Sequence, residues 1–278
     1  MKKYLLVAID GTHYHSSKNI KCQCCQTKKD SKTGDTTYFH TAITPTIVHP
    51  KLKKVIALFQ EFISNDDGEK KQDCEVNASK RWLDKFTLFA SQYKLIILGD
   101  DLYSRVPMIK KIVEKGHSFI LVCKETSHKI LYEQVETFKL ANSHKIFTTT
   151  RMHNGKKQIL TYNFINELLL TGSNTNNEEV NWCELVITNL EGEQLHCFSF
   201  VTDLKITDKN VQEIVEESKK LHIKQDTLCA IISNASRDNQ KTIITSLKNL
   251  KKDALKANRP AILVFGKVVR FNIYNHNV

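Results

Sequence analysis

The architecture of this chain follows from the stretch Tyr4-Leu5-Leu6-Val7-Ala8-Ile9-Asp10-Gly11-Thr12-His13-Tyr14-His15. Five apolar residues run without a break and end on Asp10, a pattern that predicts a strand buried on both faces of a sheet. Gly11 then allows the chain to turn sharply. A carboxylate at the end of a buried strand loses hydration unless a cation or a hydrogen-bond donor compensates it. Asp10 is therefore either a metal ligand or a residue that caps the strand-to-turn boundary.

Composition and charge narrow the class of protein. The chain has 278 residues, of which 41% are hydrophobic, and only nine glycines and four prolines. This suffices for one large domain or two small ones and argues against a disordered or fibrous chain. The formal net charge of +11 favours a polyanionic partner, nucleic acid first and an acidic membrane surface second. The alternative is a basic protein without such a partner.

The sequence gives no sign of a membrane span. No apolar run approaches the ~20 residues of a membrane helix. The basic start Met1-Lys2-Lys3 is followed by too short an apolar run for a signal peptide. We therefore expect no membrane contact and a cytoplasmic location. The eight cysteines are then expected as reduced thiols or metal ligands, not as a disulfide framework.

Apolar runs and turn signals divide the first half of the chain into strands and helices. We predict strands over residues 4–9, 38–43, 55–62, 94–99 and 117–123, helices over residues 72–89, 107–115 and 127–139, and a polar, cysteine-bearing loop over residues 16–33. Tight connections would make the first three strands an antiparallel meander. The later alternation of strand and helix predicts a parallel section of sheet with crossover helices.

The pattern changes beyond residue 143. We predict strands over residues 148–152, 158–164, 182–189 and 194–201, with turns at Asn154-Gly155 and Glu191-Gly192, an exposed loop over residues 172–179, helices over residues 208–221 and 241–258, and a terminal strand pair or frayed end over residues 261–274. The predicted organisation is a first part of a core over residues 1–140, a β-rich insertion over residues 141–205 and the remainder over residues 206–278.

A three-strand meander, a helix and then a strand ending in acid is the order of a ribonuclease H-like core. The predicted fold is therefore α/β, a ribonuclease H-like mixed sheet flanked by helices with a β-rich insertion. In that order the first strand and the strand after the helix are neighbours, so Asp10 and Asp100 could share Mg²⁺ or Mn²⁺. Asp101 follows directly, and alternation turns one residue of this doublet toward the site and the other away.

Several longer blocks occur in a specific order along the chain. They are Ala8-Ile9-Asp10-Gly11-Thr12-His13-Tyr14, Asp67-Gly68-Glu69-Lys70-Lys71-Gln72-Asp73-Cys74-Glu75, Lys80-Arg81-Trp82-Leu83, Ile97-Leu98-Gly99-Asp100-Asp101-Leu102-Tyr103-Ser104, Phe119-Ile120-Leu121-Val122-Cys123-Lys124, Ser127-His128-Lys129, Asn181-Trp182-Cys183-Glu184-Leu185 and Glu213-Ile214-Val215. With these blocks, the chain resembles the bacterial insertion-sequence transposases of the DDE type over roughly residues 1 to 225.

The resemblance implies a catalytic core in which Asp10 is the first acid and Asp100 the second, with Tyr103 as the aromatic residue that follows the second acid. It implies DNA transposition, that is, metal-dependent hydrolysis at transposon ends followed by attack of a 3′ hydroxyl on target DNA. The expected partner is double-stranded DNA, and the expected protein is bacterial, nucleoid-associated and able to form a homodimer. The β-rich block would be the insertion between the second and third acids.

The third acid is where the chain departs from the family. The family's glutamate aligns with Gln225, a neutral ligand, and Asp226 lies about 100° further round a helix. The third metal position therefore stays open between these two residues. Beyond Gln225 the family pattern ends, and we expect no N-terminal DNA-binding region. The alternatives are a DNA-binding remnant without catalysis, or a nuclease that hydrolyses without joining strands.

A second candidate metal site lies in the polar loop. Cys22-Gln23-Cys24-Cys25 contains a C-x-x-C, and Cys22, Cys25 and two of the nearby histidines could bind Zn²⁺. Those histidines are His13, His15, His40 and His49. The alternative is a surface loop with reduced thiols.

Several lysines, two tryptophans and one histidine could have either a functional or a purely structural role. The lysine clusters, expected to contact phosphates or to form solvated helix faces, are Lys51, Lys53, Lys54, Lys110, Lys111, Lys219, Lys220, Lys248, Lys251 and Lys252. Trp82 and Trp182 could stack on bases, although a tryptophan on a helix face usually belongs to the core. His128 could line the cleft or lie exposed beside a capping serine.

Overall fold

The structure, a computed structural model, describes residues 4–49, 55–63, 74–89, 92–171, 178–218, 228–234, 239–246, 249–257 and 261–265. The chain forms two compact units, Met1–Leu221 and His222–Val278. The first unit contains the expected first part of the core together with the expected β-rich insertion. The boundary between the units therefore falls later in the chain than either predicted boundary.

A nine-stranded mixed sheet forms the centre of the first unit. Its strands are β1 (Tyr4–Ala8), β5 (Thr46–Val48), β6 (Ile56–Ala57), β8 (Lys94–Gly99), β9 (Ser118–Val122), β10 (Lys145–His153), β11 (Lys156–Leu169), β12 (Glu179–Thr188) and β13 (Gln194–Thr202). The strand order is β10-β11-β12-β13-β9-β8-β1-β5-β6. Strands β1, β8 and β9 are parallel, and their neighbours on both sides are antiparallel to them. The predicted α/β class, with a mixed sheet and flanking helices, is confirmed.

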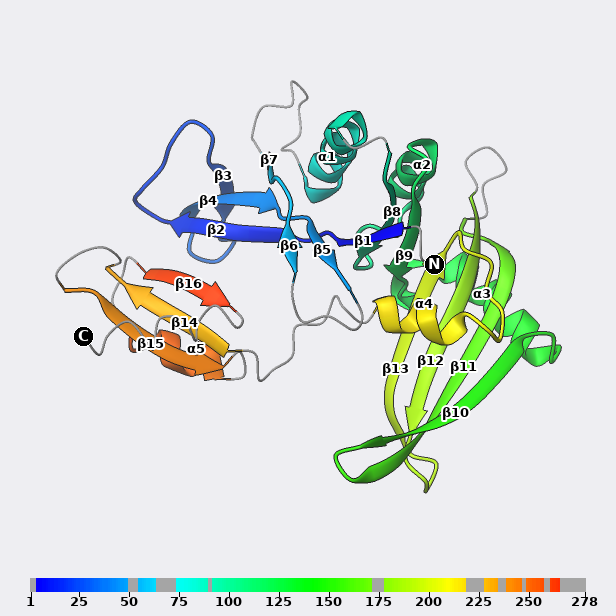
Figure 1. The fold of residues 1–278 in the computed structure, drawn as a ribbon. Coiled ribbons are helices and arrows are strands. Elements are labelled where there is room, and N and C mark those ends of the chain that lie inside the picture. The colour runs from blue at the N-terminus through cyan, green and yellow to red at the C-terminus, as the bar shows by residue number, and fades with distance from the viewer. Residues whose placement is uncertain are drawn as a thin grey trace. The chain divides into compact units, whose positions relative to one another are not determined.

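An antiparallel meander is present, but its middle strand in the main sheet is β5, and the strand predicted over residues 38–43 lies in a second sheet. A second sheet holds β2 (Gly11–Ser17), β3 (Gln26–Lys29), β4 (Thr36–Ile43) and β7 (Glu61–Ile63), and β4 pairs with the other three. Figure 1 shows β1 running on into β2, and in the sequence β4 likewise precedes β5 and β6 precedes β7. The first two strands of the meander thus begin or end at a junction between the sheets, where Thr44 N donates to Asp10 O at 3.0 Å.

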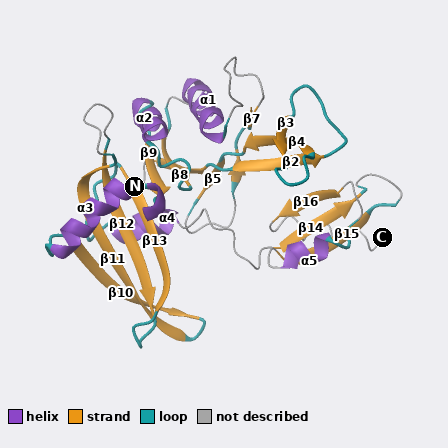
Figure 2. Cartoon of the chain, turned by 180° about the vertical axis from the view of Figure 1, so that it is seen from behind, coloured by secondary structure: helices purple, strands orange, loops and turns teal. Residues whose placement is uncertain are grey.

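Four helices cover the two faces of the main sheet. They are α1 (Glu75–Phe89), α2 (Val106–Glu114), α3 (Lys129–Leu140) and α4 (Val211–Ser218). Helices α1, α2 and α3 pack on the face that carries Val7, Ile97 and Leu121, while α4 packs on the face that carries Leu6, Ile96 and Ile120. Figures 1 and 2 show α3 and α4 on opposite faces of the strands. Because neighbouring strand residues alternate between the faces, both faces need apolar side chains, and the unbroken apolar runs supply them.

The predicted β-rich segment consists of β10, β11, β12 and β13, and its four strands are longer than predicted or shifted by a residue or two. Strand β13 pairs with β9, so the segment extends the central sheet. The turn at Asn154-Gly155 is confirmed: both residues have positive φ, 51° and 76°. A two-residue hairpin of this kind requires positive φ at both positions, which Asn and Gly adopt at low cost.

Several predictions in the first unit need correction. The predicted loop over residues 16–33 contains strand β3, because Gln26–Lys29 pairs with β4 despite its polar sequence. The single strand predicted over residues 55–62 is two short strands, β6 and β7, in different sheets. The helix predicted to begin at residue 208 begins at Val211. Residues 172–177 of the predicted loop lie outside the described residues.

The described part of the second unit is a three-stranded antiparallel sheet and a short helix. Strand β14 (Leu228–Ser233) lies between β15 (Lys241–Ser246) and β16 (Ala261–Phe265), and α5 spans Leu250–Ala254. The basic helix predicted over residues 241–258 is therefore wrong over its first third. Four of the six residues in β15 are Thr or Ile, whose branched side chains favour a strand, and β14 supplies the pairing partner. Strand β14 itself is not predicted above.

Among the described residues, no helix combines the length and the apolar composition that a membrane crossing requires.

Candidate functional site

Asp10 and Asp100 lie at the same end of the main sheet. Strands β1 and β8 are parallel and in register, with Ala8 opposite Leu98, and Ile9 N donates to Leu98 O at 2.9 Å. Asp10 lies two residues after Ala8, and Asp100 lies two residues after Leu98, so the same register brings the two aspartates side by side. The predicted neighbourhood of these two acids is thereby supported by the pairing of their strands.

A third acid, Glu75, joins them from the first turn of α1. A Cβ atom added to Gly11 would overlap the carboxylate carbon and both carboxylate oxygens of Glu75, so this carboxylate lies directly against the backbone that follows Asp10. The buried Tyr103 hydroxyl donates to Glu75 Oε2 at 3.5 Å. No sequence pattern marks Glu75 as a site residue, although Glu75 ends one of the quoted blocks.

The three carboxylates influence one another electrostatically. Desolvation raises the pKa of Asp10 above its ordinary value, and the charge of Asp100 raises it further, against the lowering effect of the Gly11 N–H. The pKa of Glu75 is raised by desolvation and by the charges of Asp10 and Asp100, while His13 and Tyr103 lower it. Crowded acids with raised pKa values are typical of a site that binds cations.

Asp101, which was predicted as a metal ligand beside Asp100, has different surroundings. Its carboxylate accepts hydrogen bonds from Lys124 N at 2.7 Å and from Ser127 Oγ at 2.6 Å, and Oδ1 lies 3.7 Å from Nε2 of the buried His128. Asp101 is not among the charges that raise the pKa of Asp10 or Glu75. Of the doublet, Asp100 is the residue that faces the other acids, and Asp101 holds the loop before α3.

His128 is buried, with 6% of its surface exposed, and its Nε2 lies 2.8 Å from Ser104 Oγ. It lines a pocket together with Arg105, Ser127 and Lys129, but Asp10, Glu75 and Asp100 do not line this pocket. The alternative of an exposed histidine is wrong. Desolvation lowers the pKa of His128, which favours the neutral imidazole. His128 therefore contacts Ser104 and Asp101 and belongs to the polar network around the Asp101 carboxylate.

The predicted third metal position lies outside the described residues. Gln225 and Asp226 both fall in residues 219–227, so the choice between them remains a prediction. Within the described residues, Glu75 is the third acid that lies close enough to interact with the charges of Asp10 and Asp100.

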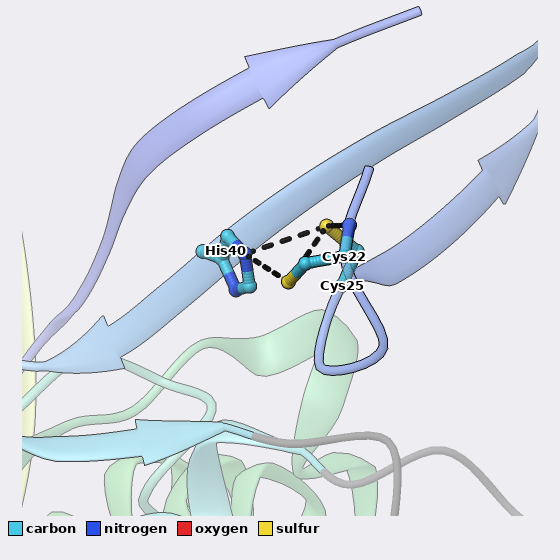
Figure 3. A group of neighbouring side chains, drawn as sticks. All are labelled: Cys22, Cys25 and His40. Carbon is cyan, nitrogen blue, oxygen red and sulfur yellow. Dashed lines mark hydrogen bonds between the residues drawn. The ribbon is translucent and has the colours of Figure 1, made fainter. Parts of the chain in front are cut away.

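A second group brings Cys22, Cys25 and His40 together (Figure 3). Cys22 Sγ lies 3.6 Å from Cys25 Sγ, and His40 Nε2 lies 3.3 Å and 3.4 Å from these two sulfur atoms. Within the described ranges, this is the one group of three or more His, Cys, Asp or Glu side chains whose ligand atoms all lie within 4.8 Å of one another. Asp10, Glu75 and Asp100 are more widely spaced.

The remaining candidates have mainly structural roles where they are described. Trp82 and Trp182 are fully buried, which confirms the core interpretation. Lys111 pairs with Asp84 at 2.8 Å and Lys110 with Glu178 at 3.6 Å, while Lys252 is exposed. The other lysines of the predicted clusters lie outside the described residues or, for Lys251, have no described side chain.

Comparison with known proteins adds no relative: no family model matches the chain, and no curated protein matches it. The site is therefore interpreted from its own geometry.

Proposed function

We propose that this protein is a metal-dependent phosphoryl-transfer enzyme that acts on double-stranded DNA, with the chemistry of a DDE-type transposase. The observation that carries the proposal is the convergence of Asp10, Asp100 and Glu75, from β1, β8 and the first turn of α1. The resemblance of the quoted sequence blocks to insertion-sequence transposases supports the same conclusion.

The strand order supports a ribonuclease H-like core. Numbered by their order in the chain, the five strands β1, β5, β6, β8 and β9 have the spatial order third, second, first, fourth, fifth. Each pair of neighbours among the first three is antiparallel, and the last two are parallel to the first. This is the arrangement expected when a meander is followed by two strands joined through helices, and Asp10 and Asp100 follow two neighbouring strands of it, β1 and β8.

The donor set fits a hard divalent cation. Magnesium and manganese prefer carboxylate oxygens, and three acids supply up to three negative charges in a partly desolvated place. Bound there, such ions would polarise the scissile phosphate and stabilise the oxygens that attack and leave. The ligand atoms of Asp10, Glu75 and Asp100 do not all lie within 4.8 Å of one another, so binding would draw these carboxylates together.

Other residues of the chain prepare the site. Gly11 has no side chain and so leaves room for the Glu75 carboxylate against the backbone. The buried Tyr103 hydroxyl donates to that carboxylate and helps to orient it. The net charge of +11 would attract the DNA backbone, so binding should weaken steeply as salt rises.

The test is nicking of supercoiled plasmid with Mg²⁺ or Mn²⁺, beside calorimetric titration of the same ions. Asp10→Asn, Asp100→Asn and Glu75→Gln should each lower the nicking rate on the order of 10²-fold or more, because each removes a charge that the transition state needs. Asp101→Asn is the matched control: it makes the same chemical change one residue away, at a carboxylate held by Lys124 and Ser127. It should keep both metal binding and nicking.

The outcomes separate the candidate functions. Joining of a labelled 3′ end to target DNA would support transposase chemistry, whereas nicking without joining would favour a nuclease. Salt-sensitive DNA binding with no nicking would favour a remnant that binds DNA without catalysis. Equal loss of nicking in Asp100→Asn and Asp101→Asn would contradict the proposed site.

A further inference from the structure

We propose that Cys22, Cys25 and His40 form a zinc site that is separate from the carboxylate site. Cys22 lies in the connection between β2 and β3, Cys25 directly precedes β3, and His40 lies in β4. Both thiols and Nε2 of the imidazole point at one another in Figure 3. Thiolate sulfur and imidazole nitrogen are the donors that zinc prefers in structural sites.

The spacing of the donor atoms matches a tetrahedral ion. With Zn–S of about 2.3 Å and Zn–N of about 2.0 Å, tetrahedral angles separate two sulfur ligands by about 3.8 Å and a sulfur from a nitrogen by about 3.5 Å. The observed separations are 3.6 Å between the sulfur atoms and 3.3 Å and 3.4 Å from sulfur to Nε2. All three edges therefore agree with one face of the tetrahedron to within about 0.2 Å.

The backbone builds this arrangement before any ion binds. Gln26 pairs with Phe39 in the antiparallel ladder of β3 and β4, so Cys25 and His40 are the next opposite pair and share a face of the sheet. Cys25 N donates to Cys22 O at 3.2 Å, which closes a tight turn between the two cysteines. Cys22 N donates to Cys25 Sγ at 3.2 Å, a contact that stabilises a thiolate.

Three protein donors leave one tetrahedral position for water or a further side chain. Cys22 is exposed, so the site is open to solvent on that side, whereas Cys25 is buried. A zinc ion held here would fix the Cys22–Cys25 turn to the centre of β4 and so stabilise the second sheet of the first unit. This role does not depend on the proposed reaction with DNA.

A pair of cysteines could instead form a disulfide, which requires the sulfur atoms to approach to ~2.05 Å. The position of His40 favours a zinc site over a disulfide, because a disulfide needs no imidazole nitrogen close to both sulfur atoms. Binding of zinc also requires both thiols to release their protons, so affinity should fall as the pH is lowered.

The experiment uses the full chain, purified under reducing conditions, dialysed with zinc and then freed of excess metal. We expect about one equivalent of zinc per chain. Cys22→Ser and His40→Gln should lower zinc affinity by at least about 100-fold, since even outer partners of zinc ligands contribute 10- to 100-fold. Cys24→Ser is the matched control, an exposed cysteine in the same loop that is outside the group, and it should retain the parental affinity.

Cobalt(II) provides a second readout that reports the ligands directly. The parent and Cys24→Ser should show a thiolate-to-cobalt charge-transfer band, and Cys22→Ser should show a weaker one. Because Cys22 is exposed, this variant tests the site even if Cys25→Ser fails to fold. A reduced parent that retains no zinc, or a Cys24→Ser variant that loses as much zinc as Cys22→Ser, would overturn the proposal.

Discussion

Asp100 and Asp101 show how neighbouring residues of the same type acquire different roles. Asp100 follows the buried strand β8 and acts on the pKa of Asp10 and Glu75. Asp101 instead accepts hydrogen bonds from the loop that leads to α3. The difference arises from the turn after β8, where Leu102 N donates to Asp100 Oδ1 at 2.9 Å and Tyr103 N donates to Asp100 O.

Glu217 should make the stability of the protein depend on pH. Burial raises its pKa from the ordinary 4.5 to about 7, with a contribution from Glu213, and Oε2 has no hydrogen-bond partner among the described residues. The folded state therefore prefers the protonated acid, and stability is lost as the pH rises from about 4.5 through about 7. Glu217→Gln removes this penalty and should stabilise the protein at pH 8 by up to about 3 kcal/mol.

The gain should vanish near pH 4, where the parental carboxyl is protonated in both states. Urea denaturation of the parent and Glu217→Gln across this pH range measures it. Glu216→Gln, at an exposed position of the same helix, is the control and should show no such pH dependence. A constant difference between parent and Glu217→Gln at all pH values would contradict the assigned titration.

Gly11→Ala should disturb the carboxylate site without unfolding the protein. The new Cβ would overlap the Glu75 carboxylate, which is the far end of a flexible side chain and can swing away. We expect weaker Mg²⁺ binding in calorimetry and a change in melting temperature of only a few degrees. In a Glu75→Ala background the same substitution should have no further effect on Mg²⁺ binding, because the clash is gone. Additive losses would mean that Gly11 acts through another residue.

At the scale of the elements, helix α1 joins the site to the core. Its first residue, Glu75, reaches the carboxylate site, while Ala78, Trp82 and Phe86 are buried. These apolar residues recur at four-residue spacing and so lie on one face, as the sequence predicts. Trp82 Nε1 donates to Phe59 O at 3.1 Å, which satisfies its only polar group. Packing of this helix therefore also fixes the position of Glu75.

Trp82→Ala should cost about 3–5 kcal/mol of unfolding free energy, because it leaves a large cavity in a fully buried position. The matched control is Leu88→Ala on the same helix. Leu88 is 85% exposed, so this substitution should change the unfolding free energy by no more than about 0.5 kcal/mol. Chemical denaturation measures both. Similar costs for the two variants would show that α1 packs by a different face.

At the scale of the whole molecule, the two units differ in the core they contain. All the buried residues of the two large apolar clusters, one on each face of the main sheet, belong to the first unit. The second unit has 57 residues, from His222 to Val278, a size at which a single core is marginal. The first unit should therefore fold by itself.

A chain that ends at Leu221 tests this expectation and the third metal position together. It lacks Gln225 and Asp226 but keeps Asp10, Glu75 and Asp100. We expect cooperative thermal unfolding and Mg²⁺ affinity within about threefold of the full chain, since the three described acids remain. If the shortened chain folds but loses Mg²⁺ binding, a residue of the second unit completes the site, and Gln225 or Asp226 is the first to test by substitution.

The sequence by itself determined the elements with strong local patterns. Unbroken apolar runs predicted β1, β8 and β9, because strands buried on both faces need apolar residues at every position. Helical spacing predicted α1, α2 and α3, and Asn154-Gly155 predicted its hairpin turn. The nearness of Asp10 and Asp100 followed from the order of these elements.

Only the tertiary structure decided which distant residues meet. Glu75 lies 65 positions from Asp10, and nothing in its neighbours marks it as a site residue until α1 packs beside β1. Likewise, the ladder of β3 and β4 selected His40 from four nearby histidines, and pairing with β14 made β15 a strand. Local patterns record how a segment buries its own side chains, whereas a site depends on the register and packing between segments, which no single segment encodes.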